Sequence, residues 1–341
     1  MSKPFIDVAA GLILRPDGSL LLAERPADKP WSGWWELPGG KIEAGESVLR
    51  ALARELNEEL GIEVTESTPW VTYTHEYPKN IVRLAFCRVT GWIGEPAGIE
   101  GQRLAWVDPL QALTVGPLLP ATEPPMRWLQ LPDRYLLTSI GSGEGLAAFL
   151  ARLTAALQSG VKLVQFREPA WAASGIEPDI YAAFEHVLQR CHKFGARCLI
   201  NSCHPESWWP LADGVHFRAA DTHSPGAKTY AAARPAPAAA NAEPAATSNN
   251  APVRRRHLVG VSAHTANDLA AARALDADFA VLGHVLDTPS HPGEAAMGWE
   301  RFAALASQAS LPVFAIGGQS QHTVKAAHQH GAHGIAGIRN T

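Results

Sequence analysis

The sequence predicts an α/β protein of two domains, the second of which is a (β/α)8 barrel. At 341 residues the chain is long for one hydrophobic core. From Arg134 onward, short apolar runs alternate with alanine-rich helical segments, and the runs read RYLLTSI, VKLVQF, RCLI, GVHF, HLVGVS, FAVLGHV, LPVFAI and GIAGI. Several of them lack the polar alternation of a half-exposed strand, which is typical of a parallel sheet buried on both faces. Eight strand–helix repeats over about 200 residues predict the barrel.

The part of the chain before this barrel has a different pattern of strands and one amphipathic helix. The expected elements are a strand over 5–14, its hairpin partner over 20–24, a helix over 47–60 and strands over 69–76 and 81–92. The turn residues Pro16-Asp17-Gly18 join the first two strands. The segment 115–132 is too rich in proline for a continuous element. We therefore place the domain boundary at its end, with domains over 1–132 and 133–341.

Two irregularities interrupt the barrel pattern. An Ala/Pro/Asn-rich segment without periodicity lies within about 222–256, and we expect a disordered insertion there that replaces the fourth helix of the barrel. Its Arg254-Arg255-Arg256 run is interpreted as the solvated end of a linker, with polyanion binding as the alternative. The sequence also stops at Thr341, directly after the eighth predicted strand, so we expect the barrel to lack its last helix.

Composition and charge argue for an ordinary globular protein. The chain is 46% hydrophobic and 18% charged, and its net charge of -4 provides no general attraction to nucleic acid or to anionic membranes. We expect neither a membrane partner nor direct binding of nucleic acid. The N-terminus lacks a signal-peptide pattern, no apolar run is long enough to span a bilayer, and the four cysteines have no disulfide-framework spacing. A cytoplasmic location is the simplest expectation.

The segment that carries chemistry runs from Gly40 to Ile62 and reads GKIEAGESVLRALARELNEELGI. On a helix, Glu55, Glu58 and Glu59 are spaced i, i+3 and i+4, so their carboxylates project from one face. Like charges this close repel each other unless a cation lies between them. A hard divalent ion such as Mg²⁺ satisfies oxygen ligands and also binds substrate phosphates.

The neighbouring residues decide between a metal site and a plain acidic surface. An isolated E-x-x-E-E pattern on a helix is most simply a solvated acidic face. Here the loop Leu37-Pro38-Gly39-Gly40-Lys41 precedes it, and its glycines permit a tight turn whose backbone carbonyls approach an ion. Arg54 is placed to pair with Glu46 and so fix the loop against the helix. Loop and helix together favour the catalytic interpretation.

This segment resembles the Nudix box and matches it at every defining position, which are Gly40, Glu46, Arg54, Glu55, Leu56, Glu58, Glu59, Gly61 and Ile62. The resemblance extends through most of residues 5–131 and is nearest to the MutT-type 8-oxo-dGTP diphosphatases, through ERPADK, WWELPGGKIEAGE, GEPAGIEGQ and LPATEPP. It implies an α/β/α sandwich with a mixed sheet. It also implies that a nucleoside triphosphate is hydrolysed at the β-phosphorus to a monophosphate and pyrophosphate, a step in sanitation of the nucleotide pool and DNA repair.

The same resemblance implies roles for single residues. Metal ligands would be the Gly39 carbonyl and the carboxylates of Glu55, Glu58, Glu59 and Glu100, with Mg²⁺ as the ion and Mn²⁺ as a possible substitute. Glu55 or Glu100 would serve as the base, and Arg54 belongs to the catalytic set. Substrate contacts would come from Arg25, Lys41 and Thr122. For Arg25 a plain surface arginine is the alternative, and for Glu100 an ordinary loop glutamate.

One position departs from the MutT-type pattern. In Ala121-Thr122-Glu123-Pro124, threonine stands where that pattern carries an asparagine that reads the purine edge. An asparagine side chain offers a donor and an acceptor in one plane, whereas threonine offers a single hydroxyl. The pyrophosphatase chemistry is unaffected, but the base preference is left open. A broader nucleoside triphosphate or dinucleotide hydrolase is the alternative.

The barrel resembles thiamin phosphate synthase and the related thiazole tautomerase TenI across residues 134–339, through VQFRE, LIN, DGVHF, VGVSAHT, LGHV and LPVFAIGG. In such barrels the carboxyl ends of the strands form the active site. The candidate residues at these ends are Gln165, Arg167, Asn201, His264, His284, Gly317 and Gly318. The two glycines suit a phosphate, since bare backbone amides can close on an anion, and a tight strand-to-helix turn is the alternative.

Three departures count against synthase activity. The family's Asn-Asp magnesium pair reads Asn201-Ser202, and its two lysines read Pro169 and His291. His284 instead resembles the tautomerase, in which a histidine at this point shuttles protons. The barrel is therefore a degenerate relic, an active thiazole tautomerase or synthase, or a module that binds a thiazole phosphate or another phosphate ligand without catalysis.

Overall fold

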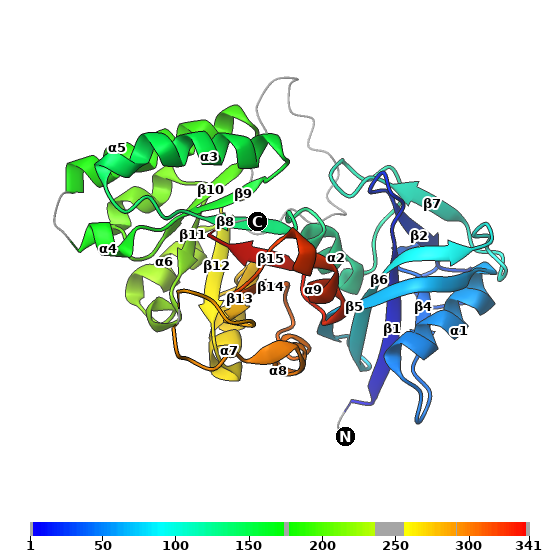
Figure 1. The fold of residues 1–341 in the computed structure, drawn as a ribbon. Helices are drawn as coiled ribbons and strands as arrows, with labels where there is room; N and C mark the ends of the chain where they lie inside the picture. Colours follow the sequence, from blue (N-terminus) through cyan, green and yellow to red (C-terminus); the bar gives the residue numbers. More distant parts are fainter. Residues whose placement is uncertain (1–2, 174–176, 236–255, 291, 339–341) are drawn as a thin grey trace. The chain divides into compact units, whose positions relative to one another are not determined.

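The protein is described by a computed structural model that covers residues 3–173, 177–235, 256–290 and 292–338. Two compact units divide between Leu131 and Pro132 (Figure 1). The elements of the first unit are β1 Phe5–Ile13, β2 Leu20–Glu24, β3 Trp35–Glu36, β4 Gly39–Lys41, α1 Val48–Leu60, β5 Glu63–Glu76, β6 Ile81–Ile93, β7 Leu104–Val107, the 3-10 turn η1 Pro120–Thr122 and α2 Glu123–Trp128.

The centre of the first unit is a four-stranded mixed sheet in the order β4-β1-β6-β5. Strand β1 runs parallel to β6 and antiparallel to β4, and β5 is antiparallel to β6. Alternate residues of β1 face opposite sides, as the period of a strand requires. Ala9 and Ile13 pack with α1, whereas Ala10 and Leu12 pack with Trp128 of α2. Helices therefore cover both faces, and the predicted sandwich with a mixed sheet is confirmed.

The hairpin predicted for residues 5–24 is wrong. The turn forms, with the Gly18 amide donating to the Arg15 carbonyl. However, β2 belongs to a second, three-stranded sheet in the order β3-β2-β7, and only the single bridge between Leu14 and Leu20 joins the two strands. The backbone groups of β1 are used by β4 and β6 instead, which local turn chemistry cannot reveal.

The proline-rich segment also differs from the prediction, because part of it is a continuous helix. Helix α2 begins at Glu123, and Pro124 and Pro125 lie in its first turn. The first amides of a helix have no intrahelical acceptor, so proline costs nothing there. Strand β5 likewise begins at Glu63, six residues before the predicted start.

The second unit contains a closed barrel of eight parallel strands, as predicted. Its elements are β8 Arg134–Leu137, η2 Gly143–Gly145, α3 Leu146–Gln158, β9 Leu163–Phe166, α4 Pro169–Ala172, α5 Glu177–Lys193, β10 Arg197–Asn201, η3 Glu206–Leu211, β11 Gly214–Phe217, η4 Ala219–Asp221, α6 Pro225–Ala233, β12 Leu258–Ala263, α7 Ala266–Ala274, β13 Phe279–Gly283, α8 Gly298–Ala306, β14 Val313–Ile316, η5 Gln321–Thr323, α9 Val324–Gln329 and β15 Gly334–Gly337. Pairing of β15 with β8 closes the ring.

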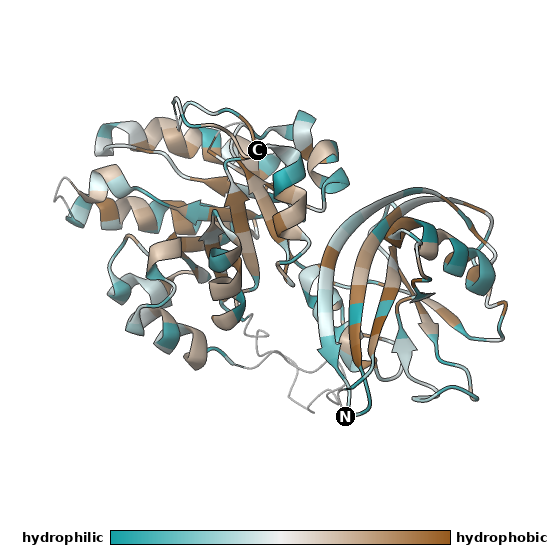
Figure 2. Cartoon of the chain, turned by 90° about the horizontal axis from the view of Figure 1, so that it is seen from below, coloured by the Kyte–Doolittle hydropathy of each residue, from teal (hydrophilic) through white to brown (hydrophobic). Residues whose placement is uncertain are grey.

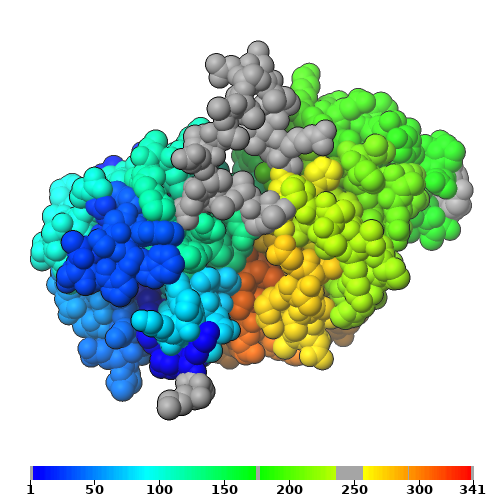
Figure 3. Space-filling view, turned by 180° about the vertical axis from the view of Figure 1, so that it is seen from behind, coloured from blue at the N-terminus to red at the C-terminus, as the bar shows by residue number. Residues whose placement is uncertain are grey.

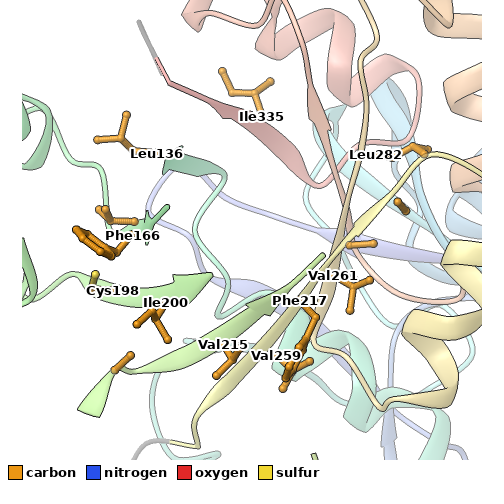
Figure 4. Close-up of a cluster of buried hydrophobic side chains, with 14 of the residues drawn as sticks. Leu136, Phe166, Cys198, Ile200, Val215, Phe217, Val259, Val261, Leu282 and Ile335 are labelled. Atoms are coloured by element: carbon orange, nitrogen blue, oxygen red, sulfur yellow. The ribbon is translucent and has the colours of Figure 1, made fainter. Parts of the chain in front are cut away.

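The barrel core is a layer of apolar side chains between strands and helices. Phe166 of β9, and Val215 and Phe217 of β11, lie in this layer (Figure 4). Figure 2 shows the same division, with hydrophobic strands in both units and hydrophilic outer helix surfaces. Because the strands alternate, every second side chain of the barrel points to its interior instead.

The predicted loss of the fourth barrel helix is wrong. Helix α6 occupies Pro225–Ala233, inside the segment expected to be disordered, and Ser224 caps it by accepting a hydrogen bond from the Ala227 amide at 3.1 Å. In Figure 3 the yellow-green segment before residue 236 borders the yellow segment after 255, as the parallel pairing of β11 with β12 requires. Residues 236–255, with Arg254 and Arg255, lie outside the described residues, as do those after 338 that bear on a final helix.

No helix in the described ranges is long and apolar enough to cross a membrane. All four cysteines are free thiols, and burial raises the pKa of Cys87 to about 12.

Candidate active site

Helix α1 has an apolar face and an acidic face, and the apolar face fixes its position. Its buried side chains are Ala51, Leu52, Leu56 and Leu60, which pack against β1 and β6. Ser47 caps the first turn, and Gly61 ends the helix at φ 68°, in the left-handed region that glycine adopts without strain. With these residues inside, Glu55 and Glu59 are only partly exposed and Glu58 is open to solvent.

Arg54 is the centre of an ionic network on the acidic face. Its Nε and Nη2 donate to the Glu46 carboxylate at 3.2 and 3.0 Å, so the predicted pair is present. Its Nη1 donates to Glu55 at 2.8 Å and to Glu58 at 3.3 Å, and Nη2 also donates to the Lys41 carbonyl at 3.1 Å. One guanidinium therefore joins the loop before α1 to two carboxylates of the helix.

The glycine loop lies so close to its neighbours that side chains do not fit. Gly39 has φ 142°, and a Cβ there would overlap the carbonyl oxygen of Ala9 in β1. A Cβ on Gly40 would overlap the carboxylate of Glu55. The Gly39 amide donates to Glu59 at 3.1 Å. Backbone and carboxylates therefore meet directly, as the two adjacent glycines of the sequence predict.

Beside this loop a small pocket gathers four further acidic or basic groups around Glu59, which are Glu24, Lys29, Glu36 and Glu100. Its lining is Ala23, Glu24, Pro26, Lys29, Glu36, Leu37, Pro38, Gly39, Glu59, Glu100 and Gln102. Burial, reinforced by the charges of Glu36 and Glu100, raises the pKa of Glu59 to about 7, although the Gly39 amide and Lys29 oppose this shift. The surroundings of Glu59 therefore contain too little positive charge to balance a carboxylate there.

Two cations from one loop hold two of the other carboxylates of the pocket, Glu36 and Glu100. Arg25 donates from Nη1 to both oxygens of Glu36, at 2.7 and 2.6 Å, and from Nε to the Pro30 carbonyl at 2.7 Å. Lys29 forms an ion pair with Glu100 at 2.6 Å. Burial nevertheless raises the pKa of Glu36, with Arg25 acting in the opposite direction.

The donor chemistry of this site fits a hard divalent cation. The available groups are carboxylate and carbonyl oxygens, which Mg²⁺ and Mn²⁺ prefer as ligands. Negative charges outnumber positive charges among the groups around Glu59. Within the described ranges, however, no three His, Cys, Asp or Glu side chains are already arranged around one point to hold a metal. Arg54 accounts for this, because it holds Glu55 and Glu58 on its own guanidinium.

The other predicted substrate contacts, Lys41 and Thr122, do not line this pocket. Lys41 is an exposed residue of β4, next to Gly40. Thr122 is only 4% exposed, at the end of η1. The sequence argument missed Glu36 and Lys29, although both lie in segments that carried the resemblance. Their signal was the cluster of charges immediately flanking the glycine loop and Arg25.

Inside the barrel, polar side chains form a continuous hydrogen-bonded chain. Asn201 donates to Gln165 at 2.8 Å, and Gln165 donates to the Tyr135 hydroxyl at 2.9 Å. Tyr135 contacts His216 Nδ1 at 3.2 Å, and His216 Nε2 contacts the Ser262 hydroxyl at 2.9 Å. Burial, with a smaller contribution from Arg167, lowers the pKa of His216 to about 3, so this imidazole is neutral. Gln165, Arg167 and Asn201 are thus brought together.

The remaining barrel candidates form a separate group around the end of β13. His264 contacts the Gly283 carbonyl through Nδ1 at 2.8 Å. A Cβ on Gly317 would overlap His284, and one on Gly318 would meet Leu286. Both glycines have positive φ, at 93° and 64°. His284, Gly317 and Gly318 therefore lie close together, with His264 one hydrogen bond from Gly283. His291, the expected lysine position, lies outside the described residues.

Ser202 stands where the thiamin phosphate synthase pattern has the aspartate of its magnesium-binding Asn-Asp pair. Its hydroxyl donates to Asp221 at 2.6 Å and accepts from the Arg218 amide at 3.0 Å. The Arg218 guanidinium donates to the same Asp221 carboxylate at 2.6 and 3.1 Å. The one carboxylate near Ser202 in this cluster is thus already neutralised by an arginine.

Comparison with known proteins matches two families, one to each part of the chain. Residues 4–129 match the NUDIX domain, and residues 241–341 match thiamine monophosphate synthase. An 8-oxo-dGTP diphosphatase of Haemophilus influenzae is 41% identical over 121 residues, which is 36% of this chain and 88% of that protein. The chain belongs to the Nudix family.

Two further relatives show the range of the match. A CTP pyrophosphohydrolase of Escherichia coli is 43% identical over 119 residues, covering 35% of this chain and 87% of that protein. A putative thiamine-phosphate synthase 2 of Aquifex aeolicus is 28% identical over 211 residues, covering 62% of this chain and 97% of that protein. The first unit is therefore a Nudix hydrolase of phosphoric anhydride bonds, and the second is a thiamine phosphate synthase-like barrel.

The close packing of the Nudix loop gives a direct test of its geometry. We expect Gly39→Ala to lower the free energy of unfolding of the Nudix unit by about 3 kcal/mol or more, because positive φ and overlap with the Ala9 carbonyl act together. Gly45→Ala is the matched control. It also has positive φ, at 81°, but its surroundings are open, so strain alone should cost about 1–2 kcal/mol. Urea unfolding measures both, and equal losses would contradict the packing.

Proposed function

We propose that the Nudix unit is a Mg²⁺-dependent nucleoside triphosphate pyrophosphohydrolase that converts 8-oxo-dGTP to 8-oxo-dGMP and pyrophosphate. Such an activity removes an oxidised nucleotide before it is incorporated into DNA. The observation that supports this most directly is that Glu55 and Glu59 meet the glycine loop, while Arg54 joins Glu58 to Glu55. A cation and a polyphosphate would complete the charge balance there. Relatives named 8-oxo-dGTP diphosphatase support the choice of substrate.

The metal would be held by the Gly39 carbonyl and by Glu55, Glu58, Glu59 and Glu100. When bound, Mg²⁺ neutralises phosphate charge and makes a water molecule more nucleophilic. Residue Glu59 favours such an ion, since burial beside two other carboxylates has raised its pKa to about 7. Arg54 holds Glu55 and Glu58 in reach, and it would give up part of these contacts if both carboxylates held a cation.

The chain's own residues then move one proton and hold the substrate. A water oxygen bonds to the β-phosphorus, and the bond from that phosphorus to the oxygen bridging the α-phosphate breaks. Glu55 or Glu100 accepts the proton of the water, and the products are the nucleoside monophosphate and pyrophosphate. Lys29 keeps Glu100 beside the pocket through its 2.6 Å ion pair. Arg25 and Lys41 bind phosphate oxygens.

We expect this hydrolase to accept more than one nucleobase. Relatives include both 8-oxo-dGTP diphosphatases and a CTP pyrophosphohydrolase. Thr122 supplies one hydroxyl where the MutT-type pattern has the amide of an asparagine. It would therefore recognise the edge of the base less strongly than an asparagine does. A panel of oxidised and ordinary nucleotides compared by kcat/KM ranks the bases.

The chemistry is tested with Glu58→Gln. We expect kcat for pyrophosphate release from 8-oxo-dGTP to fall by about 100-fold or more, because an amide binds a divalent cation far less well than a carboxylate. Removing the metal with a chelator should abolish turnover, and added Mg²⁺ should restore it. Pyrophosphate and orthophosphate are assayed separately.

The matched control is Glu63→Gln, an exposed glutamate just beyond α1 at the start of β5, which should keep full activity. Orthophosphate as the first product, or equal rates in wild type and Glu58→Gln, would refute the mechanism.

For the barrel we propose metal-independent binding of a thiazole phosphate carboxylate, with isomerisation at His284 as the candidate reaction. The observation that favours this over a synthase is the Ser202–Asp221–Arg218 cluster, in which an arginine guanidinium lies on the carboxylate. An Asp221 already paired in this way has little remaining attraction for a magnesium ion.

Calorimetric titration of the full chain with this ligand tests the barrel. We expect saturable binding that a metal chelator leaves unchanged, and product formation by NMR that is lost in His284→Gln. Binding without turnover makes the barrel a ligand-binding module. Absence of both, or a strict need for Mg²⁺, would contradict the proposal.

A further inference from the structure

An exposed tryptophan, Trp31, lies in a strained turn on the loop that also carries Lys29 of the acidic pocket. Trp31 has φ 64°, in the left-handed region that is strained for a residue with a side chain. The residue is 43% exposed, so a large part of it remains open to solvent. Strained backbone that persists in this way is a frequent mark of a binding position.

The loop that carries Trp31 is attached to the pocket at two points. Arg25 donates to the Pro30 carbonyl and, from the same guanidinium, to Glu36 in the pocket lining. Lys29 binds Glu100, also in the lining. The turn itself is closed by the Trp34 amide, which donates to the Trp31 carbonyl at 3.1 Å. Trp31 is therefore fixed beside the place where substrate phosphates would bind.

Other aromatic rings support Trp31 from behind. Its ring contacts Trp34 edge-on, at 4.7 Å between centroids and 77° between planes, and it lies 6.4 Å from Tyr77. Tyr77 in turn contacts His75 at 4.4 Å. Tyr73 and His75 lie on the same face of β5, with 6.2 Å between their ring centroids, and Tyr77 directly follows the end of that strand. These rings, Trp31, Trp34, Tyr73, His75 and Tyr77, are called the aromatic ledge.

The ledge also reaches the segment expected to read the base. A hydrogen bond with the backbone of Ala121 lowers the pKa of the Tyr77 hydroxyl, against the larger raising effect of burial. Ala121 is the neighbour of Thr122 in η1. The ledge thus lies between the loop anchored on the acidic pocket and the turn that carries Thr122.

We propose that Trp31 stacks on the base of the nucleotide whose phosphates occupy the acidic pocket, which rests on the proposed function of the Nudix unit. Every base has a π-face, so stacking adds affinity without selecting among bases. This accounts for recognition of several nucleotides when the Thr122 hydroxyl alone discriminates little between base edges. Selectivity and affinity then reside in different residues.

The test is binding of a nucleoside triphosphate with a methylene bridge between the α- and β-phosphates, measured on the full chain with Mg²⁺. We expect Trp31→Ala to raise Kd by about tenfold for guanine and cytosine nucleotides alike. Trp31→Phe, which keeps a π-face, should stay near wild type, whereas Trp31→Leu, which keeps only apolar bulk, should resemble the alanine variant. Binding of inorganic tripolyphosphate, which has no base, should be the same in all four proteins.

These outcomes separate the inference from the proposed function. An unchanged nucleotide Kd in Trp31→Ala, or an equal loss of tripolyphosphate affinity, overturns the stacking role. Stacking without pyrophosphate release from a natural nucleotide would leave this inference standing and reject the proposed hydrolysis. Trp92→Ala removes another partly exposed tryptophan, which stacks on Trp106 near the far end of β6, and should leave nucleotide binding unchanged.

Discussion

The site depends on the ion pairs that Arg54 forms with neighbouring glutamates, because these offset the repulsion among their negative charges. Three glutamates within five residues of α1 repel one another, and a helix face is a poor place to separate them. Arg54 holds two of them together with Glu46, while the third, Glu59, is turned into the pocket and held by the Gly39 amide. This arrangement keeps the carboxylates close in the absence of a metal. It also leaves Glu59, whose pKa is raised to about 7 mainly by burial, as the group with the greatest need for a cation.

The hydrophobic core sets this geometry. Leu52 and Leu56 are fully buried against β1, so the opposite side of α1 cannot rotate away from the glycine loop. The loop is in turn held against β1 by pairing of Gly39 and Gly40 with Ala10 and Ala9. Precision at the site therefore comes from a packed helix and a paired strand, whose positions side-chain motion does not change.

Sequence reasoning was strongest where chemistry and periodicity lie within one short segment. The acidic face of α1 and the Arg54–Glu46 pair follow from residue spacing alone, and the eight barrel strands follow from repeated apolar runs. It failed where long-range pairing decides. The β1–β2 hairpin was wrong because β1 pairs with β6, more than sixty residues later. Glu36, Lys29 and the ledge around Trp31 were missed because their meaning depends on which loop folds over the pocket. Likewise α6 forms because its buried Ala227 packs on the barrel, although the composition around it suggested disorder.

The central claim is that the carboxylates of α1 bind a divalent ion at the glycine loop. Titration of the full chain with Mn²⁺, followed by electron paramagnetic resonance, measures this directly. We expect wild type and Glu63→Gln to bind Mn²⁺ with the same affinity. In Glu59→Gln this affinity should be lower by about tenfold or more. Equal Mn²⁺ affinity in wild type and Glu59→Gln would contradict it.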